Sequence, residues 1–376
     1  MKISNVLITG GAGFIGSNLA IALQAMGYVV TIMDNLSPQI HGEHSPLLSS
    51  IPSSIRFIDG DVRFRMDWTK ALDGQDAVIH LAAETGTGQS MYEIERYMDV
   101  NVRGTGLFLD ILANTNHSVK RILVASSRSI YGEGKYCCNK HSIVYPLARS
   151  SSNMNLKDFA VKCPNCASNV SLLATDESSL IHPTSVYGIS KQVQEQLVLT
   201  MGRSLGIPSV ALRYQNVYGP GQSLSNPYTG ILSIFSTRIL NGNDVLIFED
   251  GNESRDFVYI DDVVTATIAA LESPKADFEV FNVGSGVPTS VLTVANYLIE
   301  AYGSTAAVKV TGNFRLGDIR HNYADLEKIR SILKVTPNVD FESGIQRFAH
   351  WVKLQGVVQD RYEVSIQELK SRGLYR

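Results

Sequence analysis

The chain has little of what marks several large classes of protein. It contains only four cysteines in 376 residues, all between Cys137 and Cys166, so it lacks the spread-out disulfide framework of a small secreted domain. It contains no apolar run near the roughly 20 residues that a membrane-spanning helix needs. The first residues lead straight into a strand-like segment, so we expect no signal peptide. These absences predict a soluble cytoplasmic protein without a membrane partner.

An excess of charge of either sign is also lacking. Lysine and arginine total 33, aspartate and glutamate total 36, and the formal net charge is -3. A nucleic-acid binder would need a basic face to offset phosphates, so we expect no nucleic-acid partner. With 44% hydrophobic and 18% charged residues the chain can bury a core, which excludes global disorder. At roughly 150 residues per domain, the length predicts two domains or one domain with an added lobe.

The first 35 residues have the pattern of a strand, a glycine turn, a helix and a second strand. Residues 6–9 are apolar and β-branched, as in a buried parallel strand. After the glycines, apolar residues recur with a period of about 3.6, which predicts a helix that Gly27 ends. Residues 28–33 form a second strand-like run that leads into Asp34.

The glycine turn has features of a dinucleotide-binding loop. Gly10 permits a tight turn, Gly13 lets backbone amides approach a diphosphate, and Gly16 lets the helix pack closely on the strand. The helix N-terminus adds unpaired N–H donors and a positive dipole. Asp34 can accept hydrogen bonds from both hydroxyls of an adenosine ribose and repels a 2′-phosphate, so NAD is favoured over NADP. The alternative, a flexible surface turn, would not require the flanking strands or the acid.

Strands and helices alternate along much of the remaining chain. We expect strands at residues 55–58, 77–83, 121–127, 209–213 and 279–283, and helices at 92–115 and 185–203. Residues 35–54 are rich in Ser, Pro, Gly and His and are expected to form a long loop. The alternation predicts an α/β fold with a doubly wound parallel sheet, a Rossmann fold, whose ligands bind beyond the carboxyl ends of the strands.

The pattern also suggests how the chain divides. We expect residues 1–215 to form the NAD-binding Rossmann domain, with a cysteine-bearing insert at 133–175. Residues 216–376 lack the clean alternation and are expected to form mostly a smaller substrate-binding lobe. We expect the chain to return to the Rossmann domain around 255–283.

Three residues have the chemistry of hydride transfer at a secondary alcohol. Tyr187 and Lys191 are four apart on a predicted helix and so share one face. A phenol with a pKa near ~10 is too weak a base at neutral pH, but a neighbouring ammonium would lower that pKa. Ser127, at the end of a predicted strand, can hold the hydroxyl that loses its proton. Alone, a Tyr and a Lys at this spacing are also compatible with a solvated helix face.

The ensemble of motifs is similar to that of a known superfamily. The segments that carry the similarity are Thr9–Gly16, Asp34–Leu36, Gly60–Val62, His80–Ala83, Asn101–Thr105, Ser126–Ser127 with Tyr131–Gly132, Tyr187 with Lys191, and Arg255–Asp262. They resemble the extended short-chain dehydrogenase/reductases, in the nucleotide-sugar epimerase/dehydratase branch. Three further stretches, Glu84–Tyr92, Arg213–Gln222 and the cysteine-bearing insert after Tyr131–Gly134, resemble dTDP-L-rhamnose 4-epimerases in particular.

The resemblance implies a set of site residues. Those expected at the cofactor are Gly10, Gly13, Phe14, Ile15, Gly16, Asp34, Asn35, Asp61, Val62, Leu81, Ala82, Ala83, Thr85, Asn101, Ser126, Tyr187 and Lys191, with Asn101 orienting nearby backbone. Those expected at the substrate are Thr85, Ser127, Asn216, Arg255 and Arg320. Arginine forks match the diphosphate of a sugar nucleotide, although Arg255 and Arg320 are also compatible with an inter-lobe salt bridge.

The resemblance further implies an NAD-dependent enzyme, and three hypotheses for the function follow. Dehydratases of this branch place an Asp-Glu pair after the strand-end hydroxyl, where this chain has Arg128 and Ser129, so dehydration is disfavoured. We expect C4 epimerisation, with tightly bound NAD, between dTDP-L-rhamnose and dTDP-6-deoxy-L-talose for cell-surface polysaccharide biosynthesis. The alternatives are a UDP-glucose/UDP-galactose-type or other sugar-nucleotide epimerase and, from another class, a non-catalytic dinucleotide sensor.

Homodimerisation is also implied by the resemblance. The interface would be a four-helix bundle made from the helix of Tyr187 and the helix near residues 100–115 of two chains. Leu107, Ile111 and Leu112 are compatible with such an interface, and equally with packing on the sheet.

The insert carries two short pairs of soft donors. Cys138 and His141 form one pair and Cys163 and Cys166 the other, each with two residues between. Three thiolates and one imidazole suit a tetrahedral structural zinc ion. Reduced thiols in a surface loop, or an adventitious disulfide, remain open at this level.

Overall fold

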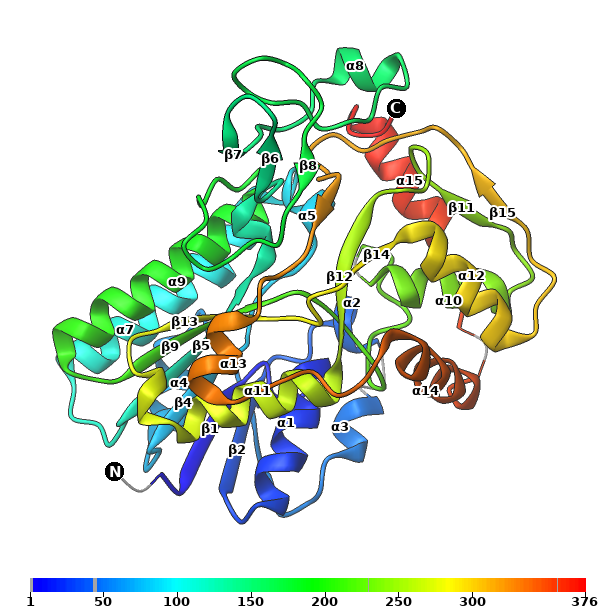
Figure 1. Ribbon diagram of the computed structural model, residues 1–376. Coiled ribbons are helices and arrows are strands. Elements are labelled where there is room, and N and C mark those ends of the chain that lie inside the picture. Colours follow the sequence, from blue (N-terminus) through cyan, green and yellow to red (C-terminus); the bar gives the residue numbers. More distant parts are fainter. Residues whose placement is uncertain (1–2, 43–45, 229, 357) are drawn as a thin grey trace.

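The computed structural model describes residues 3–42, 46–228, 230–356 and 358–376. Its centre is a seven-stranded parallel sheet in the order β13-β9-β5-β4-β1-β2-β3 (Figure 1). The strands are β1 (Asn5–Thr9), β2 (Val29–Asp34), β3 (Arg56–Asp59), β4 (Ala77–His80), β5 (Arg121–Ser127), β9 (Ser209–Tyr214) and β13 (Val280–Val283). Strand order changes direction between β1 and β4, which is the switch point of a doubly wound sheet. The predicted fold class is confirmed.

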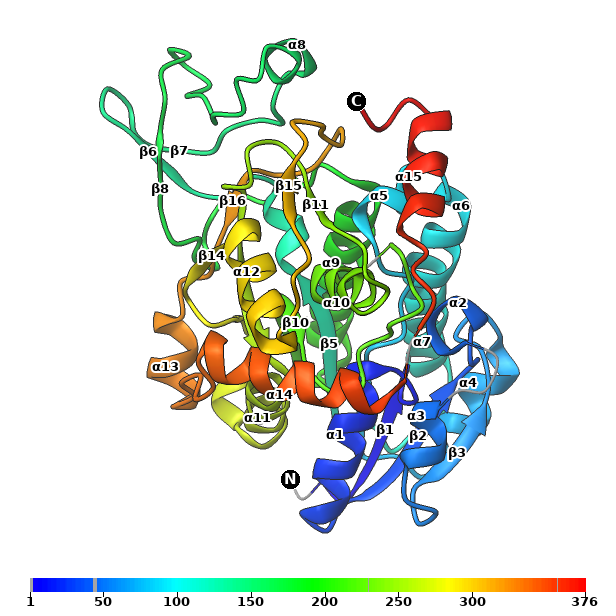
Figure 2. The ribbon, with the colours of Figure 1, turned by 90° about the vertical axis from the view of Figure 1, so that its right-hand side faces the viewer.

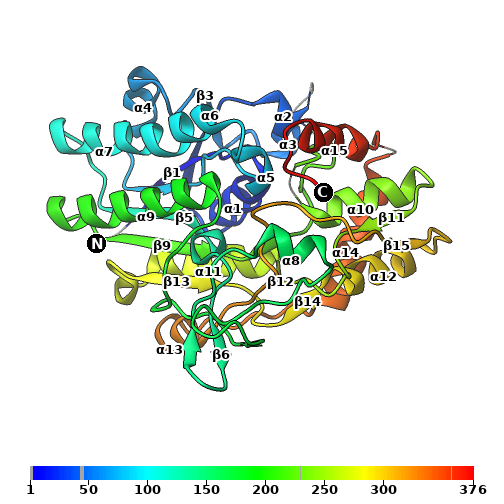
Figure 3. The same cartoon turned by 90° about the horizontal axis from the view of Figure 1, so that it is seen from above.

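Helices cover both faces of this sheet, which explains why its central strands are apolar almost without alternation. Every residue of β5 and β9 is buried. One face carries α4 (Arg65–Leu72), α7 (Gly104–Asn114) and α9 (Val186–Leu205). The other carries α1 (Phe14–Ala25), α11 (Ile260–Glu272) and α13 (Glu327–Leu333). Viewed from above, the two helix layers lie on either side of the strands (Figure 3).

The helix expected at 92–115 is divided into three segments. They are α6 (Ile94–Tyr97), the π-helical η1 (Met98–Arg103) and α7. The π-helical turn contains Asn101, whose side chain is fully buried and tied to Glu84 and Ser190. Wider turns of this kind recur at functional sites. The loop expected at 35–54 also holds two short helices, α2 (Pro38–His41) and α3 (Pro46–Ser50), and residues 43–45 lie outside the described part.

The apolar residues proposed for a dimer interface on α7 do not all face outward. Ile111 and Leu112 are each 3% exposed and belong to the core beneath the sheet, whereas Leu107 is half-buried. The alternative of packing on the sheet therefore holds for Ile111 and Leu112.

A second lobe covers the carboxyl ends of the strands. Its elements are β10 (Asn216–Tyr218), α10 (Ile231–Leu240), β11 (Val245–Ile247), β12 (Ser254–Tyr259), β14 (Pro288–Ser290), α12 (Val291–Tyr302), β15 (Val308–Val310), β16 (His321–Asn322), α14 (Phe341–Leu354) and α15 (Tyr362–Ser371) (Figure 2). It has its own apolar core, in which Phe235, Leu298 and Phe348 are buried. Between β12 and β14 the chain returns to the large sheet through α11 and β13. Among the described helices even the longest, α9, lacks the unbroken apolar length that crossing a bilayer demands.

The insert projects from this body at the top of Figure 1. It contains an antiparallel sheet in the order β7-β6-β8, made by β6 (Tyr136–Cys138), β7 (Ser142–Val144) and β8 (Ser171–Leu172), and the short helix α8 (Ser151–Asn155). Arg149 anchors it by donating two hydrogen bonds, each 2.8 Å long, to Glu249 of the second lobe.

Candidate active site

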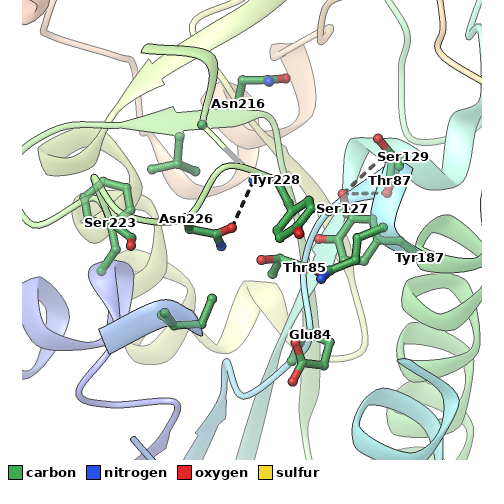
Figure 4. A pocket seen from close by; sticks show the side chains of 18 of the residues that line it. Glu84, Thr85, Thr87, Ser127, Ser129, Tyr187, Asn216, Ser223, Asn226 and Tyr228 are labelled. Carbon is green, nitrogen blue, oxygen red and sulfur yellow. Dashed lines mark hydrogen bonds between the residues drawn. The ribbon is translucent and has the colours of Figure 1, made fainter. Parts of the chain in front are cut away.

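A cavity of about 540 Å³ lies where the carboxyl ends of the strands meet the second lobe (Figure 4). Most residues expected at the cofactor or the substrate line it. They are Gly10, Gly13, Phe14, Ile15, Gly16, Asp34, Asn35, Asp61, Val62, Leu81, Ala82, Ala83, Thr85, Ser126, Ser127, Tyr187, Lys191, Asn216 and Arg255. Asn101 and Arg320 do not line it.

The glycine turn packs so closely on the neighbouring backbone that it leaves no room for side chains at Gly10 and Gly16. We call this turn the glycine cradle. Gly10 has φ +67°, and a Cβ there would lie 2.8 Å from the backbone nitrogen of Ala82. A Cβ at Gly16 would lie 2.3 Å from the carbonyl oxygen of Gly10. Helix α1 starts directly after Gly13 without a side-chain cap, so its first amides are open to a ligand. This open cradle fits the diphosphate of a dinucleotide.

Asp34 ends β2 at the edge of the cavity and is 8% exposed. Its Oδ2 accepts a hydrogen bond from the amide of Ala12 (3.1 Å), and its Oδ1 accepts one from the amide of Leu36 (3.0 Å). His41 Nε2 lies 3.2 Å from Oδ1. A carboxylate oxygen can accept more than one hydrogen bond, so this fixed acid can still receive ribose hydroxyls. His41 could not be predicted as a site residue, because residues 35–54 were expected to form a loop.

Asp61 forms the neighbouring wall. Burial alone would raise the pKa of its carboxyl, but hydrogen bonds from Arg63 and Asn35 lower it. Arg63 NH2 lies 2.7 Å from Oδ2, and Asn35 Nδ2 donates to the same oxygen at 2.9 Å. Asp61 is therefore held as a rigid anion, and Arg63 is neutralised by it.

Asn101 acts on the backbone beside the cavity, as the resemblance implies. Its Oδ1 accepts a hydrogen bond from the Glu84 amide (2.8 Å), and its Nδ2 donates to the Glu84 carbonyl (3.0 Å). The same Nδ2 donates to Ser190 Oγ on α9 (2.9 Å). One side chain thus ties the loop after β4 to the helix that carries Tyr187.

Tyr187 lies in the first turn of α9, whose N-cap is Ser185. Its backbone amide donates to Ser90 Oγ (3.0 Å), and its ring meets the Tyr97 ring edge to face with 6.4 Å between centroids. Burial raises the pKa of Tyr187, and the Ser127 hydroxyl and the charge of Arg128 oppose that rise. Figure 4 shows the phenol beside Ser127 at the cavity wall.

Ser127 ends β5 with its oxygen already hydrogen-bonded as an acceptor. Ser129 donates to that oxygen twice, from Oγ at 2.8 Å and from its backbone nitrogen at 3.2 Å (Figure 4). The Ser127 proton is therefore left to donate toward Tyr187 or a ligand oxygen. Ser129 was missed as a site residue, since it stands where dehydratases have an acid.

Lys191 lies one turn after Tyr187 and is 3% exposed. Its Nζ donates to Gln194 Oε1 at 2.8 Å, and Gln194 Nε2 donates to Thr105 Oγ1 at 2.8 Å. Burial lowers the pKa of Lys191 to about 7. The expectation that Lys191 lowers the pKa of Tyr187 stays a prediction, and Arg128 contributes a positive charge that lowers the same pKa.

Two cavity arginines lack carboxylate partners among the described residues. Arg128 Nε donates to Asn216 Oδ1 at 2.8 Å, and Arg255 donates to the backbone oxygens of Ser254, Ile319 and Arg320. Burial, followed by the charge of Arg255, lowers the pKa of Arg128 to about 9. Two guanidinium groups that repel each other in a cavity would be stabilised by an anionic ligand. Arg128 was not among the predicted site residues, since in the sequence it stands out only as a departure from the dehydratase pattern.

Arg320 does not line the cavity with Arg128 and Arg255, which corrects the expectation that it binds the substrate. Its guanidinium lies 2.7 Å from Glu249 and from Asp250 and 3.6 Å from Glu253. With its charge matched by acids of its own lobe, it braces the segment before β16. Arg315, which pairs with Asp318 at 2.8 Å, is the arginine of this segment that lines the cavity. Spacing alone could not tell which of the two turns inward.

The geometry therefore defines a dinucleotide cradle beside a Ser-Tyr-Lys set, with unpaired guanidinium groups opposite. Comparison with known proteins agrees. The NAD dependent epimerase/dehydratase family model matches residues 6–152 and 167–284, more than half of the chain, and leaves out part of the insert. The chain belongs to this family of enzymes, which confirms the resemblance.

Individual relatives match over most of their length. The dTDP-L-rhamnose 4-epimerase of Burkholderia thailandensis is 37% identical over 349 residues, which cover 92% of this chain and 94% of that protein. The UDP-glucose 4-epimerase of Thermotoga maritima, solved with UDP-glucose, has a TM-score of 0.74 and 30% identity, covering 93% of this chain and 99% of that one. The UDP-glucuronic acid 4-epimerase of Bacillus cereus, solved with UDP-glucuronic acid and NAD, has a TM-score of 0.76 and 27% identity, with the same coverage.

Proposed function

We propose that this chain is an NAD-dependent 4-epimerase of a nucleotide-diphosphate sugar that passes through a transient 4-keto intermediate. The observation that carries the proposal is the placement of Ser127, Tyr187 and Lys191 on one wall of a cavity that also holds the glycine cradle and two unmatched arginines. NAD held there would supply the acceptor and donor of the hydride within one turnover, so the enzyme would need no exchange of cofactor.

The chain's own residues handle the proton and the orientation. Ser127 donates a hydrogen bond to the C4 oxygen, because its own acceptor side is occupied by Ser129. Tyr187 takes the proton from that oxygen and returns it after the sugar has presented its other face. Lys191, beside Tyr187, would hold the ribose of the cofactor. Its partner Gln194 fixes the ammonium in place.

The diphosphate must stay anchored while the sugar turns. Arg255, Asn216 and Arg315 line the side of the cavity that the second lobe provides, and Arg128 stands between them and Tyr187. We assign Arg128 and Arg255 to the anionic part of the substrate, since neither is neutralised by a described carboxylate. Thr85 also lines the cavity and is assigned to both the cofactor and the sugar (Figure 4).

The sugar we favour is dTDP-L-rhamnose, converted to dTDP-6-deoxy-L-talose in the cytoplasm for cell-surface polysaccharide. Support comes from the relative that carries this activity in its name and matches nearly the whole chain. The second candidate is a UDP-sugar, because two solved structures that are similar to this chain hold UDP-glucose and UDP-glucuronic acid. Sugar pockets change specificity with few substitutions, so assays must decide.

The deciding experiment incubates the purified enzyme separately with dTDP-L-rhamnose, UDP-glucose and UDP-glucuronic acid and identifies products by NMR. We expect conversion of the dTDP sugar at the highest kcat/KM. A substrate with deuterium at C4 should keep its label in the product. Loss of the label to solvent would exclude the 4-keto route, and preference for a UDP-sugar would replace the substrate while leaving the reaction type in place.

We further propose a homodimer through α7 and α9, which pack against each other on one face of the sheet (Figure 3). Leu107 on α7 and Leu197 and Met201 on α9 remain only partly buried, and Ile189 is 44% exposed. Light scattering should give twice the chain mass. Ile189→Glu with Leu197→Glu should give monomers.

A further inference from the structure

Four side chains of the insert, from two segments separated in sequence, converge at one point outside the cavity. The ligand atoms of Cys138, His141, Cys163 and Cys166 all lie within 4.8 Å of one another. They come from two short segments, one at the β6-β7 turn and one before β8. This convergence has no part in the reaction described above.

Three of the six distances between these ligand atoms are those of a tetrahedral metal site. Cys138 Sγ lies 3.8 Å from Cys166 Sγ, and His141 Nδ1 lies 3.6 Å from Cys138 Sγ and 3.5 Å from Cys163 Sγ. Zinc bonds of about 2.3 Å to sulfur and about 2.05 Å to nitrogen give tetrahedral edges of about 3.8 Å between sulfurs and about 3.6 Å between sulfur and nitrogen. We propose that these three thiolates and one imidazole bind a structural zinc ion.

The backbone around the first pair supports ligation. The amide of His141 donates to the carbonyl of Cys138 (3.3 Å), which closes a tight turn and brings both side chains to one side. The amide of Lys140 lies 3.4 Å from Cys138 Sγ and points its proton at the sulfur. Amide hydrogen bonds of this kind stabilise a thiolate and fix the direction of its lone pairs.

The second pair lies on a similar turn. The amide of Ala167 donates to the carbonyl of Cys163 (2.9 Å), and the amide of Cys163 donates to the carbonyl of Ser168 (2.8 Å). Ala167 takes φ +57°, a left-handed backbone that turns the chain directly after Cys166. Two independent turns thus present two donors each to the same point.

The insert needs such a link because its own core is small. Its three strands have three, three and two residues, and the apolar cluster around them has five buried residues: Tyr136, Cys138, Val144, Val161 and Cys163. Two of these five are themselves ligands of the proposed site. A core of this size cannot hold a sheet together, and small domains of this kind commonly depend on a metal or disulfides. A zinc ion would close the loop from Cys138 to Cys166 and supply that stability.

Cys137 provides the internal control. It precedes Cys138 in β6, so its side chain points to the opposite face of the small sheet, and it is not among the four converging residues. If cysteine content alone drew metal to the insert, removing Cys137 would matter as much as removing Cys163.

The test uses the full-length chain, purified without a histidine tag. Elemental analysis should give about one zinc per chain, and X-ray absorption should show three sulfurs at about 2.3 Å and one nitrogen. Cys137→Ser should keep the zinc. Cys163→Ser and His141→Ala should lose most of it and lower Tm. Because the readout is bound metal, this result does not depend on which sugar the enzyme converts.

A thiol measurement covers the case in which Cys163→Ser fails to fold. In the native wild-type protein, a thiol reagent should modify Cys137 alone. A mercurial should modify the other three thiols as well, and a chromophoric chelator should then detect the zinc that this reaction releases. Four freely reactive thiols without zinc, or a Cys138–Cys166 disulfide found by mass spectrometry, would overturn the proposal. Equal zinc loss in Cys137→Ser and Cys163→Ser would also contradict the ligand set.

Discussion

Lys191 Nζ donates a hydrogen bond to Gln194 Oε1, 2.8 Å away and one turn further along α9. Gln194 is oriented by its other end, since Nε2 donates to Thr105 Oγ1. Thr105 in turn lies 3.0 Å from Nε2 of His80. Burial, together with the charge of Lys191, lowers the pKa of His80 to about 3, so that ring is neutral. The lysine is thus placed by a buried neutral network that offers it an acceptor but no negative charge.

The first prediction is that Lys191→Met stabilises the NAD-free protein while abolishing activity. The pKa of Lys191 is about 7 in the folded state, against about 10.4 in an unfolded chain. Between those values only the unfolded chain binds the proton, so wild-type stability rises with pH across this window. Below pH 7 the folded state bears the whole cost of a buried ammonium. The variant should therefore be more stable at pH 6, by a margin on the order of 3 kcal/mol that shrinks toward pH 10.

Urea unfolding of both proteins at pH 6, 8 and 10 measures this difference. Lys70→Met, at an exposed position, is the control and should show no pH-dependent gain. A Lys191→Met protein that is no more stable than wild type at pH 6 would contradict the assignment of a destabilising buried ammonium.

The second prediction concerns the proton acceptor. Tyr187→Phe removes the hydroxyl and leaves the ring packed against Tyr97 at the same place. Because general-base catalysis contributes about 100-fold to 10,000-fold, kcat should fall by about that factor, with sugar-nucleotide affinity and bound NAD nearly unchanged. Stopped assays and cofactor release by heat measure both properties.

Tyr97→Phe is the matched control for that variant. Tyr97 hydrogen-bonds the carbonyl of Thr85 through its hydroxyl, so its loss should cost about 1 kcal/mol of stability and little in kcat. If the two variants lose activity equally, Tyr187 is not the specific base.

Much of this site could be predicted because its parts are encoded locally. The turn at Gly10 and the helical spacing of Tyr187 and Lys191 depend on neighbours in sequence, so their positions follow from the strand and helix around them. Arg320 and Arg315 differ only in which way a loop segment faces, and that is decided by Glu249 and Asp250 from another part of the chain. No local pattern carries that information.

Contacts between distant parts of the chain also explain the other differences between the predicted and the observed structure. The π-helical turn at Asn101 exists because that side chain is tied to Glu84 and Ser190, which periodicity does not report. Ile111 and Leu112 have the apolar character of an interface, but their burial depends on the sheet they cover. The role of Lys191 depends on Gln194, a residue whose type alone gave no reason to notice it.

The third prediction tests the glycine cradle. Gly10→Ala places a Cβ 2.8 Å from the nitrogen of Ala82 at a residue with φ +67°. Gly74 has φ +70° with no atom within 4 Å of its would-be Cβ, so Gly74→Ala carries the backbone strain without the clash. Gly74→Ala should cost about 1 kcal/mol and keep NAD. Gly10→Ala should lose more stability and fail to retain NAD, as absorbance of the purified protein would reveal. If Gly10→Ala retains its full content of NAD, the glycine cradle is not part of the cofactor site.

The last prediction separates the arginine that faces a ligand from the one that braces the lobe. Arg128→Met removes a guanidinium without a described carboxylate partner, so KM for the sugar nucleotide should rise about tenfold to a hundredfold, the cost of a lost charge-assisted hydrogen bond. Arg320→Met removes one of the two arginine partners of Glu249, which keeps Arg149, and the guanidinium partner of the half-exposed Asp250, so it should cost about 1 to 3 kcal/mol in stability with KM little changed.

Arg128→Lys is the control for the charge of this residue. It keeps a cation but lacks the planar fork of a guanidinium, so its KM should lie between those of wild type and Arg128→Met. An unchanged KM in Arg128→Met would remove Arg128 from the substrate site.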